Sequence, residues 1–84
     1  MTTYQTTILA FGNNAAIEVP LKNLEELGSS KKPKVSAEIN DSYQFETTVA
    51  SRGGKYLLSF SKARRNESRL AAGDKITVKL ELID

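Results

Sequence analysis

The residues best suited to chemistry are six cations gathered in one part of the chain: Arg52, Lys55, Lys62, Arg64, Arg65 and Arg69. Guanidinium and ammonium groups bind phosphates and carboxylates, so a surface uniting them would suit a nucleic-acid backbone or an acidic protein. Residues 1–50 hold four lysines against six acids, whereas residues 51–84 hold eight lysines and arginines against four acids. The net charge is only +2, which supplies little long-range attraction. A solvated helix whose cations are partly offset by Glu67 and Asp74 is the plainer interpretation.

Catalytic chemistry has few candidates in this sequence. The chain has no histidine and no cysteine, which excludes the commonest general base and any thiolate site. Ser59 and Lys62 match the S-x-x-K pattern of serine acyl-enzymes, but the S-D-N and K-T-G elements that accompany this pattern are missing. The carboxylates fall on the polar sides of expected strands or are adjacent on a helix, so no pair is expected to converge. We therefore expect no catalytic residues, no cofactor, no metal and no enzymatic activity.

Length and composition fit one small domain over residues 1–84, with few core residues to spare. The apolar stretch from Ile8 to Phe11 is too short for a signal peptide or a membrane span, and no basic segment precedes it. The absence of cysteine suits a reducing compartment. These features predict a soluble cytoplasmic protein that does not associate with a membrane.

Hydrophobic periodicity along the chain is mostly that of β-strands. In "KITVKLEL" four apolar residues share one face and polar residues share the other, as in a strand buried on one side. The residues placed inward by such alternation are Ile17, Val19, Val35, Ala37, Ile39, Tyr43, Phe45, Val49, Tyr56, Leu58, Phe60, Ile76, Val78, Leu80 and Leu82. The pattern predicts an all-β fold.

Two short segments break the alternation and predict helices. In "PLKNLEELG" leucines recur every three residues, Pro20 suits the first helical position, and Gly28 can end the helix in a left-handed conformation. In "SKARRNESRL" Ser61 can act as the N-cap, and Ala63 and Leu70 are its only apolar residues. The fold is thus expected to be all-β with one or two short helices.

The two halves of the sequence repeat one pattern: a strand, a glycine-containing turn, a strand, a short helix and a strand. The matched positions are Tyr4 and Gln5 with Tyr43 and Gln44, Ile17 and Val19 with Leu58 and Phe60, and "KVSAEI" with "KITVKL". Two units with one apolar face each can bury both faces by closing on one another. The repeat predicts a closed barrel of about six or seven strands with an internal pseudo-twofold axis.

Several segments resemble a known family, namely "GGKYLLSFSKARR" and "AAGDKITVKLELID", with "AIEVP" and "YQFETTVAS" upstream. Together they are similar to the bacterial DUF1905 family across nearly the whole chain. The Gly-Gly turn at 53–54, Arg65 and the turn at 73–74 carry the resemblance. It implies a small double-split β-barrel, related in outline to the swapped-hairpin barrels of AbrB-type transcription regulators, and it implies no established activity. Arg64 and Ser68 depart from the pattern, because apolar residues are expected at their places.

The sequence is compatible with three functional interpretations. The first is a non-enzymatic β-barrel module that binds a partner protein or a small ligand of unidentified nature. The second is a nucleic-acid-binding protein of the AbrB-like type that uses the basic patch at 52–69; the short helix and small net charge make it the less favoured interpretation. The third, an enzyme without histidine or cysteine, lacks a paired nucleophile and base. The oligomeric state is left open.

Overall fold

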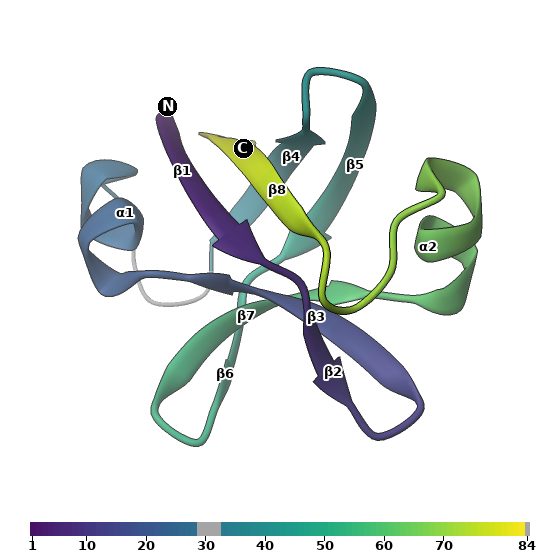
Figure 1. Cartoon of the computed structure of the whole chain (residues 1–84). Helices are drawn as coiled ribbons and strands as arrows, with labels where there is room; N and C mark the ends of the chain where they lie inside the picture. The colour runs from purple at the N-terminus through teal and green to yellow at the C-terminus, as the bar shows by residue number, and fades with distance from the viewer. Residues whose placement is uncertain (29–32, 84) are drawn as a thin grey trace.

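The computed structural model describes residues 1–28 and 33–83 (Figure 1). Within these residues eight strands and two helices follow one another along the chain. They are β1 (Thr2–Thr7), β2 (Leu9–Phe11), β3 (Asn14–Val19), α1 (Leu21–Glu26), β4 (Lys34–Ile39), β5 (Tyr43–Thr48), β6 (Ala50–Arg52), β7 (Lys55–Phe60), α2 (Lys62–Ser68) and β8 (Lys75–Leu82). The structure is mostly β with two short helices, which agrees with the prediction of strands with one or two short helices.

The strands form two antiparallel sheets of four strands each. Sheet A has the order β1-β8-β4-β5, and sheet B has the order β2-β3-β7-β6. In Figure 1 sheet A lies above the crossing strands β3 and β7, and the β2–β3 and β6–β7 hairpins extend below. Strand pairing among the described residues is divided between the two sheets and forms no closed ring, so the predicted closed barrel stays a prediction.

The strand count is higher than expected because two long strands are each divided by one buried residue. Ile8 separates β1 from β2, and Val49 separates β5 from β6. The Ile8 amide donates to Asp74 O at 2.9 Å, and the Val49 amide donates to Pro33 O at 2.9 Å. At these two residues the chain therefore passes from sheet A to sheet B with its backbone still hydrogen-bonded.

The hydrophobic core lies between the sheets and follows the predicted strand faces. The fully buried residues of the four central strands are Ile17 and Val19 on β3, Val35, Ala37 and Ile39 on β4, Leu58 and Phe60 on β7, and Val78 and Leu80 on β8. The expectation for Leu82 is wrong, since its side chain is 41% exposed. β1 begins at Thr2, opposite Leu80, so the end of β8 keeps its pairing with β4 but has no β1 neighbour on the other side.

The two halves share one arrangement with a constant spacing. β1 begins at residue 2 and β5 at residue 43, 41 residues later, and the same spacing separates β2 from β6, β3 from β7, α1 from α2 and β4 from β8. If each strand is replaced by its counterpart in the other half, the strand order of each sheet is simply reversed. This is the topology expected when a two-fold axis relates the two halves. Ile17 and Leu58 are corresponding residues and lie opposite one another on β3 and β7.

This spacing corrects one correspondence drawn from the sequence. Tyr4 does not correspond to Tyr43, because Tyr4 lies opposite Val78 on β8 and Phe45 lies opposite Ala37 on β4. Since β4 and β8 are counterparts, the structural partner of Tyr4 is Phe45.

Both helices are present, with two differences from expectation. Pro20 immediately precedes α1 instead of opening it, and its carbonyl accepts the Leu24 amide at 3.0 Å. Gly28 follows the helix with φ 71°, as predicted. In α2 the Ser61 hydroxyl accepts the Arg64 amide at 3.3 Å, which confirms the N-cap, but Ala63 is exposed. Within the described residues, neither helix has the length and apolarity needed to cross a membrane.

We expect Leu58→Ala to lower the free energy of unfolding by about 2–5 kcal/mol, because it opens a cavity at the centre of a small core. Thr77→Ala, on the polar face of β8, is expected to lower the free energy of unfolding much less. Urea unfolding of the two variants measures the difference. Similar midpoints would contradict the assignment of the strand faces.

Candidate functional site

The six predicted cations do not form one surface. Arg52 and Lys55 lie opposite one another beside the β6–β7 turn. That turn and α2 are at opposite ends of β7, which spans six residues or about 17 Å. Figure 1 shows the β6–β7 turn at the lower left and α2 at the right. The hairpin thus does not bring its two cations to the helix.

Arg64 holds α2 against the two sheets. Its guanidinium carbon lies 4.5 Å from the centre of the Phe45 ring. Its Nη1 donates to Ser59 O at 2.8 Å, and its Nη2 donates to Glu46 O at 3.3 Å. Phe45 and Glu46 belong to sheet A, whereas Ser59 belongs to sheet B. Because no residue of α2 is buried, these contacts replace the apolar packing expected at this position.

Each helix is also bound to the first residue of the strand that opens its half. The Thr2 hydroxyl on β1 donates to the Glu26 carboxylate of α1, and the side-chain Nδ2 of Asn23 donates to Thr2 Oγ1 at 2.7 Å. In the second half the Tyr43 hydroxyl on β5 donates to Glu67 of α2 at 2.6 Å. Burial, followed by the bond to Glu67, raises the pKa of Tyr43. Glu67 is therefore occupied on the β5 side of the helix.

Ser68 ends α2 by bonding to the backbone, which explains its departure from an apolar pattern. Its hydroxyl donates to Arg64 O at 2.7 Å and accepts the Leu70 amide at 3.3 Å. Arg69 follows with φ 62°, where the first half has Gly28 with φ 71°. The second half thus ends its helix with polar bonds, whereas the first half places buried Leu27 at the position of Ser68.

The three remaining cations share one hollow of about 670 Å³. It is lined by Asn13, Lys62, Arg65, Asn66, Arg69, Leu70 and Ala71, and is named the α2 hollow below. The spacing of three and four residues places the three cations on one side of the helical segment. The volume lies within the range of small-ligand sites.

Arg65 is the most constrained residue of the α2 hollow. Its Nη2 donates to Asn13 O in the β2–β3 turn at 3.2 Å. Its Nε is buried and has no hydrogen-bond partner among the described residues. A buried donor of this kind costs free energy until a partner is supplied.

The charge of the α2 hollow is not neutralised by the described part of the chain. Across those residues the ion pair formed is between Lys79 and Asp41, at 3.6 Å, on sheet A. The lining residues include no acid. A carboxylate oxygen of Asp74 accepts the Ala71 amide at 2.9 Å and thereby supports the loop beside the hollow.

The repeat provides an internal reference for this site. Arg65 stands 41 residues after Leu24, at the same helix position, and Leu24 is a core residue with 4% exposure. Lys62 corresponds to Leu21, which is 58% exposed, so of these two positions Arg65 is the one that replaces a core residue. The first half shows that this backbone accepts a leucine where the second half carries an arginine with an unpaired Nε. Positions where polar groups replace possible core packing are typical of sites at which function opposes stability.

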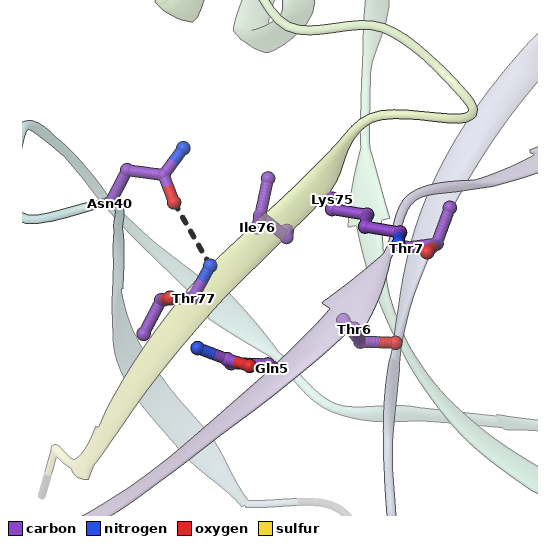
Figure 2. Close-up of a pocket in the computed structure, with 7 residues that line it drawn as sticks. All are labelled: Gln5, Thr6, Thr7, Asn40, Lys75, Ile76 and Thr77. Atoms are coloured by element: carbon purple, nitrogen blue, oxygen red, sulfur yellow. Dashed lines mark hydrogen bonds between the residues drawn. The ribbon is translucent and has the colours of Figure 1, made fainter.

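A second hollow, of about 390 Å³, lies at the ends of β1 and β8 (Figure 2). Asn40 enters it from the β4–β5 turn, where its φ is 54°. The side-chain Oδ1 of Asn40 accepts a hydrogen bond from the Thr77 backbone N–H at 2.9 Å. The backbone N–H of Asn40 donates to Thr77 O at 2.9 Å. Asn40 thus extends the pairing of β4 with β8. Apart from Lys75, the lining residues are uncharged.

A third hollow, of about 340 Å³, lies on sheet B and is lined mainly by alanines and serines, with Arg52 at one side. Ser59 lines this third hollow, whereas Lys62 lines the α2 hollow. The two residues of the S-x-x-K match therefore serve different hollows. Among the described residues there is no group of three or more His, Cys, Asp or Glu arranged to hold a metal ion.

The fold and the site define a small two-sheet β domain with a cationic hollow beside its second helix. The chain belongs to the DUF1905 family, described as a domain of unknown function, whose match covers residues 4–80 of the 84. The comparison with curated proteins finds no match. The family description states no activity, so any function has to be argued from the residues of the site.

We expect the neighbouring arginines of α2 to respond oppositely to substitution. Arg64→Ala is expected to lower the free energy of unfolding by about 1–3 kcal/mol, because two hydrogen bonds and the Phe45 contact are lost. Arg65→Leu, which introduces the residue of the corresponding position in α1, is expected to leave it unchanged or to raise it by about 1 kcal/mol.

Urea unfolding monitored by circular dichroism gives both values. Arg65→Leu destabilising the protein as much as Arg64→Ala would contradict this account, since Arg65 would then be a structural residue.

Proposed function

We propose that this protein is a non-enzymatic binding module that takes an anionic ligand in the α2 hollow. The observation that carries the proposal is Arg65, which occupies the position of a core leucine and keeps a buried Nε without a partner. Lys62 and Arg69 add two cations to the same hollow. Three cations with no acid among the lining residues favour an anion over a neutral or cationic ligand.

The chemistry of the described residues favours binding over catalysis. Ser59 and Lys62 line different hollows, so the lysine is not expected to activate the serine. Burial, with a contribution from Glu18, raises the pKa of Tyr4, which keeps this tyrosine protonated and unsuited to act as a base at neutral pH.

The closed double-split barrel implied by the family is part of the proposal. It is supported by the single buried residues, Ile8 and Val49, that carry the chain between the sheets. A cytoplasmic location is also proposed, on the absence of cysteine in the sequence.

The proposal predicts where anions perturb the protein. In ¹H–¹⁵N NMR titrations at low salt with phosphate, citrate and a hexaglutamate peptide, at least one anion is expected to shift amide signals at Asn13 and within residues 62–71. Arg65→Leu is expected to remove these shifts, and Arg52→Ala, at the distant hairpin, is the matched control. Equal shifts at the β6–β7 turn, or shifts that survive Arg65→Leu, would contradict an anion site in the α2 hollow.

Nucleic-acid binding through the basic patch is the second candidate, and a salt titration tests it. With Arg64 engaged by Phe45 and with Arg52 and Lys55 at the distant hairpin, three cations remain for phosphates. The logarithm of the binding constant should then change with log salt at a slope of about −3. We expect binding weaker than about 10 μM at physiological salt, within the range of non-specific contacts.

Fluorescence anisotropy with mixed-sequence duplex and single-stranded probes measures both quantities. Submicromolar affinity that Arg65→Leu abolishes, with the fold retained, would favour the nucleic-acid function over a small anion.

A further inference from the structure

We infer that the anion bound by the α2 hollow is the phosphate group of a small organic phosphate monoester. This inference rests on the proposed function and names its ligand class. It follows from the count of cations, from the donors that Arg65 leaves free, and from the apolar residues at one side of the hollow.

The cations match one concentrated dianion. The segment from Lys62 to Arg69 spans about 10 Å if its residues rise as in a helix, and the three cations line one hollow. A phosphate monoester carries about −1.5 to −2 charge at neutral pH on three acceptor oxygens. Single carboxylates spread along a peptide deliver less charge to so short a segment.

Arg65 provides geometry as well as charge. The bond from its Nη2 to Asn13 O fixes one side of the guanidinium group. Its Nε–H is buried and has no partner among the described residues, so an incoming phosphate oxygen would pair with it after the side chain shifts toward the hollow. A planar guanidinium can give two parallel hydrogen bonds to a phosphate, which an ammonium group cannot do.

The walls of the hollow favour an ester over the inorganic ion. Leu70 and Ala71 add an apolar side next to the cations, and Asn66 adds an amide. An organic group attached to the phosphate can contact the apolar side and lose water there. A long polyanion is less suited, because Arg64 is held by Phe45 and because Arg52 and Lys55 lie at the distant β6–β7 hairpin.

Isothermal titration calorimetry with phenyl phosphate, inorganic phosphate and hexaglutamate tests the inference on the full chain. Phenyl phosphate is expected to bind most tightly, with an affinity that rises between about pH 5 and pH 7 as its second proton dissociates. Arg65→Leu is expected to weaken this binding about tenfold or more, because a charge-assisted hydrogen bond is lost. Arg65→Lys, which keeps the charge without the planar fork, is expected to weaken it less. Arg52→Ala is expected to leave it unchanged.

The outcomes separate this inference from the function on which it rests. Arg65-dependent binding of hexaglutamate without binding of phenyl phosphate would overturn the phosphate ester and retain the anion-binding module. Equal affinity for phenyl phosphate and inorganic phosphate would overturn the organic part of the ligand. Failure of all three probes to bind in an Arg65-dependent way would overturn both proposals.

Discussion

Every ladder of sheet A joins a strand of one half of the chain to a strand of the other. β1 pairs with β8, β8 with β4, and β4 with β5. In sheet B the two halves meet through β3 and β7. Neither half can therefore complete sheet A or bury its apolar face without the other. In a domain of 84 residues this mutual burial is the main source of stability. α1 adds Leu24 to this core, whereas α2 buries no residue.

The two helices pack differently against the strands, and this is where the two halves differ. α1 contributes Leu24 to the core and is followed by buried Leu27, whereas α2 buries no residue and is held by Arg64 and Glu67. Because Arg64 and Glu67 hold α2 against the sheets, its other side can carry the cations that line the α2 hollow. The asymmetry between two otherwise corresponding helices is thus the physical basis for assigning a binding role to the second half.

Local patterns in the sequence predict the strands well and the site only in part. Alternation identifies Val35, Ala37 and Ile39 as core residues because one side of β4 faces the core along its whole length. It misses the exposure of Leu82, which depends on where β1 begins. Matching Tyr4-Gln5 with Tyr43-Gln44 misaligns the start of the repeat by two residues. The true spacing of 41 residues becomes visible only through the strand pairing.

The site required long-range information for a similar reason. The register of β3 with β7 sends the two hairpins to opposite ends of sheet B, and no local pattern contains that register. Asn13 binds Arg65 through its backbone carbonyl, so its residue type gave no signal. In the sequence, the cluster of cations and the departures at Arg64 and Ser68 mark α2 as unusual.

α2 is held by polar surface contacts, whereas α1 contributes Leu24 to the core. Native-state hydrogen exchange compares the two helices most directly, because it reports the free energy at which each one opens. Amides of α2 are expected to exchange through local opening at a lower free energy than amides of α1. Equal protection of the two helices, or exchange of α2 only through global unfolding, would contradict this expectation.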